Sequence, residues 1–183
     1  MARARGLRFS GQHQDLEEIA SQHKDTEVSV RSYFVPANIE ILERFTGLTP
    51  DRLDDEMRAL LEEHERRSVM SILTGVEAAF RMDYYERCAQ KMKDPLSRAL
   101  RAIYDLKAKK ASLADDIFDT WKVEGGADKV MIGELKGAMN YRDWLAHGRY
   151  WDPNLGRDYD YFTVYSLAQA IFEELEFIVP EDA

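Results

Sequence analysis

The segment from Arg142 to Trp151 contains an Arg and a His separated by four residues, at a point where a helical pattern reaches a glycine. A guanidinium binds an anionic phosphate through paired N–H donors. An imidazole changes its protonation near neutral pH and can therefore transfer protons to and from a reacting group. Arg142 and His147 are thus the two side-chain types that cleavage of a phosphodiester needs when no metal takes part.

These two side chains can meet only under particular conditions. Positions five apart in a straight helix point about 140° away from each other around the axis. Glycine commonly follows the last turn of a helix, so Gly148 predicts that the helix ends at His147. The pair then converges either because the helix ends there or because a second copy of the chain completes the site. Two such segments facing each other across a twofold axis would supply two Arg and two His side chains to one cleft, so we expect a homodimer.

Helical periodicity dominates the chain and must position these residues. Apolar side chains recur every three or four positions from about Asp51 to Met92, which predicts one very long helical segment with a kink near Gly75 or a break near Ser68. Cap residues and apolar spacing predict further helices at 16–23, 39–45, 95–106, 112–121, 128–145 and from Thr163 onward. Residues 28–35 form a brief β-like run that Pro36 ends. The expected fold class is all-α, a single helical bundle over residues 1–183 in which residues 1–12 are flexible.

The charge of the chain limits how it can meet nucleic acid. With 25 Lys and Arg against 34 Asp and Glu, the formal net charge is −9, which argues against broad, non-specific coating of a polyanion. Basic residues nevertheless gather between Tyr84 and Ala111, whereas no Lys or Arg follows Asp158. This distribution fits either a polyanion groove bordered by a repelling surface or two solvated helix faces.

Other features exclude several classes of protein. No apolar run approaches the length of a membrane span, and the basic N-terminus lacks the hydrophobic stretch of a secretory signal, so we expect a cytoplasmic protein without membrane contact. Di-iron bundles need Glu-x-x-His, but no carboxylate stands three residues before any of the four histidines. The single Cys88 cannot form an internal disulfide or a thiolate zinc cluster. We therefore predict neither a metal nor a cofactor.

The motif Arg142-Asp-Trp-Leu-Ala-His147, late in an all-α bundle and followed by one more helix, resembles the Arg-x4-His signature of HEPN domains. These domains are usually dimeric, and many are metal-independent ribonucleases of toxin–antitoxin, phage-defence and RNA-processing systems. The resemblance implies that Arg142 stabilises the scissile phosphate and that His147 is the general base or acid. It implies that Asp143 occupies the polar position after the Arg, where Asn is most common in the family.

Three further side chains are candidates for binding RNA. Arg149 follows the motif directly and can supplement the phosphate contact, and Tyr150 lies where it can stack on a base. Arg81 lies four residues after Glu77 on the long helical segment. Either this pair reaches the motif and orients it, or it is an ion pair along one helix face.

The resulting hypothesis is an endoribonuclease that cleaves RNA by attack of the 2′-hydroxyl and leaves a 2′,3′-cyclic phosphate. The resemblance implies a toxin or defence effector, with an antitoxin protein as a possible partner. One alternative is a non-catalytic HEPN-like dimer that binds nucleotide, RNA or a partner protein. A purely structural helical interaction module is the other.

Overall fold

The computed structural model describes residues 9–35 and 38–178, and all regular elements in these ranges are helical. The residues expected to be flexible lie partly outside these ranges, at 1–8, while residues 9–12 form no regular element. The elements in chain order are α1 (Leu16–Tyr33), α2 (Ile39–Arg44), α3 (Pro50–Gln90), α4 (Pro95–Lys107), a 3-10 turn (Ala108–Lys110), a π-helical turn (Leu113–Phe118), α5 (Asp119–Glu124), α6 (Lys129–Ala146) and α7 (Tyr161–Glu174). The expectation of an all-α chain is confirmed for the part that the structure describes.

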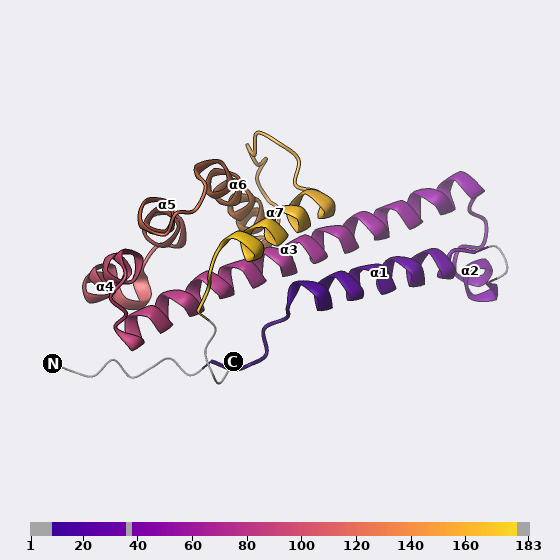
Figure 1. Cartoon of the computed structure of the whole chain (residues 1–183). Helices are drawn as coiled ribbons and strands as arrows, with labels where there is room; N and C mark the ends of the chain where they lie inside the picture. Colours follow the sequence, from indigo (N-terminus) through magenta and orange to yellow (C-terminus); the bar gives the residue numbers. More distant parts are fainter. Residues whose placement is uncertain (1–8, 36–37, 179–183) are drawn as a thin grey trace.

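Helix α3 runs through the whole molecule, with α1 along one side and α4 to α7 on the other (Figure 1). It extends without interruption over 41 residues, so the expected break at Ser68 does not occur, and Figure 1 shows no sharp bend along it of the kind expected near Gly75. Helices α1, α6 and α7 all contact α3 and support it. A glycine costs a helix about 1 kcal/mol relative to alanine, which such packing readily offsets.

Helix α1 overturns the β-like interpretation of residues 28–35. Residues 28–33 continue the helix that begins at Leu16, and Phe34 is its C-cap. Asp15 caps the first turn, and Glu18 returns a hydrogen bond to the Asp15 backbone, which completes a capping box. Packing of α1 against α3 overrides the β preference of the local sequence, because tertiary contacts outweigh intrinsic propensity.

The core follows from the apolar spacing of α3. Residues buried along this helix recur every three or four positions and face the other helices. The buried core side chains of α3 are Val69, Ile72, Leu73, Val76, Phe80, Tyr84 and Cys88. They pack in one cluster with residues of α6 and α7 that include Ile132, Leu135, Ala138, Val164, Ala168 and Ile171.

Local capping signals fix the other helix starts, with one correction. Asp94, Ser112 and Asp128 each accept a hydrogen bond from a backbone N–H of the following turn, as N-caps do. Thr163 is the expected cap of the last helix, but the cap is Asp160, three residues earlier; its side chain accepts from the backbone N–H of Thr163, and the helix begins at Tyr161. Among the described residues, no helix is long and apolar enough to cross a membrane.

Candidate functional site

Helix α6 carries the Arg–His motif in its last turn. It ends at Ala146, His147 is the C-cap residue, and Gly148 adopts a left-handed φ of +83°. The expected helix end is therefore confirmed. Arg142 is partly buried, with 19% of its side chain exposed, whereas the side chain of His147 lies at the surface.

Asp143 connects the two motif residues. Its carboxylate forms an ion pair with Arg142, with Oδ1 2.9 Å from Nη1, and its backbone carbonyl lies 2.7 Å from Nδ1 of His147. A carbonyl can only accept, so Nδ1 carries the proton in the neutral ring, and Nε2 keeps its lone pair. An imidazole held in this tautomer is arranged to act as a base through Nε2. Asp143 therefore contacts both Arg142 and His147 and can orient both side chains.

Glu77 of α3 binds Arg142 from the opposite side. Nη2 of Arg142 forms an ion pair with Oε2 of Glu77, while Oε1 of Glu77 accepts from Nε of Arg81 at 3.3 Å. Arg81 also donates to the carbonyl of Ala111 at 2.9 Å. Glu77 thus forms the helix-face ion pair with Arg81 and also contacts the motif through Arg142.

These side chains line a cavity of about 490 Å³ between α3, the π-helical turn and α6. We call it the Arg142 cavity. Its polar lining residues are Glu77, Arg81, Ser112, Asp115, Lys136, Asn140, Arg142 and Asp143. Three cationic side chains and three carboxylates face this one space, so it is polar without a large excess of either charge.

Sequence reasoning missed Lys136 and Asn140. They lie on α6 at helical spacing before Asp143, which is a signal the sequence does contain. Lys136 donates to the carboxylate of Asp119 at 2.9 Å. Hydrogen bonds from Lys122 and Lys136 lower the pKa of Asp119, so the carboxylate stays charged and holds Lys136 at the cavity.

The remaining predicted residues lie outside the Arg142 cavity. Arg149 has a left-handed φ of +58° and binds the carboxylate of Glu63 with both terminal nitrogens, at 2.6 and 3.3 Å. This bond lowers the pKa of Glu63. Tyr150 is 82% exposed, with its ring edge-on to Trp151.

His147 does not line the Arg142 cavity, and within the described residues no contact joins it directly to Arg142. Its ring lies 6.1 Å from that of Trp151, measured between centroids. The carbonyl of Trp151 accepts from Nε1 of Trp144 at 2.7 Å, which fixes the loop after the motif to α6. One chain therefore brings Arg142, Asp143 and Arg81 together and presents His147, Arg149 and Tyr150 on the adjoining surface.

Neither a metal site nor a cysteine nucleophile receives support from the described residues. In the part of the chain that the structure describes, no group of three His, Cys, Asp or Glu side chains is placed to hold a metal ion. Burial raises the pKa of Cys88 to about 12, so its thiol is not activated as a nucleophile.

The basic segment between Tyr84 and Ala111 does not form a uniform basic groove. Arg87 is buried against Asp83, and Lys107 pairs with Asp116.

Comparison with known proteins identifies no relative. No model of a protein family matches the chain, and neither a curated protein nor a solved structure matches it.

Proposed function

We propose that this chain is a metal-independent endoribonuclease of the HEPN type that acts as a homodimer. The observation that carries the proposal is the arrangement around Asp143. This residue binds the guanidinium of Arg142 through its carboxylate and fixes the tautomer of His147 through its carbonyl. An anion-binding side chain and an oriented base thus adjoin on one helix end.

The reaction follows from these two groups. Nε2 of His147 takes the proton of a ribose 2′-hydroxyl, whose oxygen then attacks the adjacent phosphorus. Arg142 stabilises the negative charge that develops on the phosphoryl oxygens. The bond from phosphorus to the 5′-oxygen breaks, and the leaving oxygen takes up a proton from an imidazolium. The products are a 2′,3′-cyclic phosphate and a free 5′-hydroxyl.

The proposed dimer supplies the imidazole that the Arg142 cavity of one chain lacks. His147 lies outside the Arg142 cavity, so Arg142 of one copy and His147 of the other are proposed to face the same phosphodiester across a twofold axis. The second imidazole then provides the acid for the leaving group. Glu77 and Arg81 hold Arg142 in position before RNA arrives.

The direct test incubates single-stranded RNA with the protein in EDTA. Arg142→Ala and His147→Ala are each expected to lower the cleavage rate by about 10²–10⁴-fold, and the wild type yields cyclic-phosphate ends. Arg52→Ala and His13→Ala are matched controls, because these exposed residues lie outside the site. Cleavage that survives either motif substitution contradicts the proposal.

A mixing experiment tests the shared cleft. Arg142→Ala and His147→Ala proteins are mixed and allowed to exchange subunits. If each site takes its Arg and His from different chains, the mixed dimer regains one Arg142–His147 pair, and part of the activity returns although the second imidazole is missing. If each site lies within one chain, no activity returns. Solution mass measures the dimer independently, and a monomer at working concentrations contradicts the shared site.

A second function has its own support. Both terminal nitrogens of Arg142 are engaged by carboxylates, so the group that must bind phosphate is already neutralised in the free chain. This favours a dimer that binds RNA, nucleotide or a partner protein without cleaving it. Binding that depends on Arg142, with no cleavage by the wild type, identifies this alternative.

A further inference from the structure

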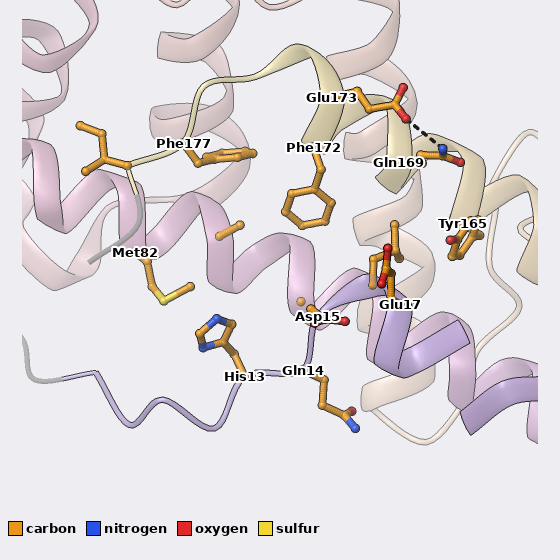
Figure 2. A pocket seen from close by; sticks show the side chains of 14 residues that line it. His13, Gln14, Asp15, Glu17, Met82, Tyr165, Gln169, Phe172, Glu173 and Phe177 are labelled. Carbon is orange, nitrogen blue, oxygen red and sulfur yellow. Dashed lines mark hydrogen bonds between the residues drawn. The ribbon is translucent and has the colours of Figure 1, made fainter. Parts of the chain in front are cut away.

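A second cavity lies on the other side of α3, away from the motif. It has a volume of about 520 Å³ and lies between residues 13–17, α3 and the end of α7 (Figure 2). We call it the α1–α7 cleft. It shares no lining residue with the Arg142 cavity, so it is a separate feature of the fold. Its size is within the range of sites that bind small molecules.

The interior of the α1–α7 cleft is apolar. Gly75 and Ala79 form part of its floor on α3, and their small side chains leave the hollow. Met82 continues the floor, while Phe172 and Phe177 form an aromatic wall with ring centroids 5.9 Å apart and an angle of 61° between the rings (Figure 2). Phe172 remains 41% exposed, so part of this wall is open to solvent.

Hydrogen bonds hold two sides of the cleft in place, the segment around Phe177 and the start of α1. Beyond Phe177, the backbone N–H of Ile178 donates to buried Asp83 at 2.9 Å, and the carbonyl of Glu176 accepts from Arg87 at 2.8 Å. On the opposite wall, the capping box of Asp15 fixes the start of α1. The cleft therefore exists before any ligand arrives, and binding needs little rearrangement.

The rim of the cleft is acidic. Among the residues that line it, Asp15, Glu17 and Glu173 carry carboxylates and His13 carries an imidazole, and there is no Lys or Arg. One oxygen of Glu173 accepts from Gln169 at 2.9 Å, as Figure 2 shows. Aromatic faces and carboxylates both attract a cation, and the apolar floor attracts a hydrophobic body.

We propose that the α1–α7 cleft binds a small organic cation with an aromatic body, of the arylalkylamine class. The ring lies on Met82, Phe172 and Phe177, and the ammonium group lies at the rim toward Glu17 and Glu173. Anionic ligands of the same shape are excluded by the carboxylates. This inference does not depend on ribonuclease activity.

Tryptamine and indole-3-propionate make a matched pair of probes, because they share a ring and a short chain but carry opposite charges. Isothermal titration of the full chain is expected to show tryptamine binding at least about tenfold more tightly, a difference of roughly 1.4 kcal/mol. Equal affinity for the two probes, or no binding of tryptamine in the millimolar range, overturns the proposal.

Three substitutions locate the site. Glu173→Gln is expected to weaken tryptamine binding severalfold, whereas Glu124→Gln, on exposed α5 surface outside the cleft, leaves it unchanged. Ala79→Phe fills the floor and is expected to abolish binding, with circular dichroism checking that the fold persists. Because Glu173 lies at the surface, its variant remains informative even if Ala79→Phe fails to fold. Unchanged binding in Glu173→Gln contradicts the assigned rim.

Discussion

Two glycines on α6, four residues apart, should respond in opposite ways to the same substitution. A Cβ at Gly133 would have no atom within 4 Å. A Cβ at Gly137 would lie 2.1 Å from the hydroxyl oxygen and 3.3 Å from Cζ of Tyr159. Alanine is favoured over glycine in a helix interior by about 1 kcal/mol, so Gly133→Ala is expected to stabilise the protein by about that amount.

At Gly137 the steric cost exceeds this gain. An ordinary contact needs at least 3.4 Å, so the hydroxyl of Tyr159 must move by more than an ångström. The ring is rigid and only 7% exposed, and it stacks on Tyr141 with centroids 5.7 Å apart, so it cannot swing into solvent freely. Overpacking of this kind costs about 1–3 kcal/mol, which leaves Gly137→Ala destabilised by up to about 2 kcal/mol after the helix gain.

Urea unfolding of the two variants measures the contrast, and a third variant tests its cause. Removing the hydroxyl with Tyr159→Phe relieves the closest contact, so Gly137→Ala combined with Tyr159→Phe is expected to recover most of the loss relative to Tyr159→Phe alone. If Gly137→Ala stabilises the chain as Gly133→Ala does, the packing of Tyr159 on α6 is not as described. If the double variant recovers nothing, the hydroxyl is not the cause.

Three further predictions concern stability and are checked by thermal or urea unfolding. Asp83→Ala removes the carboxylate that binds Nε of buried Arg87 and leaves it only the longer ion pair with Asp94 at 3.5 Å, so it is expected to cost about 3–5 kcal/mol, whereas Asp83→Leu with Arg87→Met costs much less; equal losses would contradict this. Burial and the neighbouring His64 lower the pKa of His23 from 6.5, so the unfolded chain binds this proton more readily and stability is lost as the pH falls below about 6.5. His23→Gln should flatten that dependence, and an unchanged pH profile would exclude His23 as its source. Ala108 has φ +46° and ψ −121°, so Ala108→Gly should stabilise the chain by about 1 kcal/mol, and a loss of stability would show that the backbone is not strained there.

The fold could be predicted where its causes are local. Asp94, Ser112 and Asp128 are capping residues whose side chains bond to the next turn, so the sequence alone locates these helix starts. The prediction of a β-like run after Val28 was wrong because α1 packs along α3, and a short stretch of sequence does not indicate this contact. The continuity of α3 past Gly75 has the same origin, since helices on both sides support it.

The same distinction between local and long-range causes applies to the candidate site. Arg142, Asp143 and His147 lie within six residues at the end of one helix, so a short stretch of sequence is enough to nominate them. The contact of Arg142 with Glu77 joins residues 65 positions apart, and no short-range pattern specifies which carboxylate of α3 meets α6. The π-helical turn that closes the Arg142 cavity was likewise expected as an ordinary short helix, because it begins with the same Ser112 cap that an α-helix uses.

The charges around Arg142 have a consequence for the proposed reaction. Its guanidinium is bound by Glu77 and lies 2.9 Å from a carboxylate oxygen of Asp143, so a phosphodiester must displace at least one of these contacts before charge can be stabilised in the transition state. Displacing a contact costs binding energy in the ground state. The same contacts keep the guanidinium oriented, and by neutralising its charge they prevent indiscriminate attraction of polyanions. Arg81 then becomes important, because it retains Glu77 through its own ion pair when Arg142 turns to the phosphate. If the chain is the proposed ribonuclease, its acidity and its neutralised arginine are expected to favour RNA that is held by further contacts near His147 over RNA that meets the surface by charge alone.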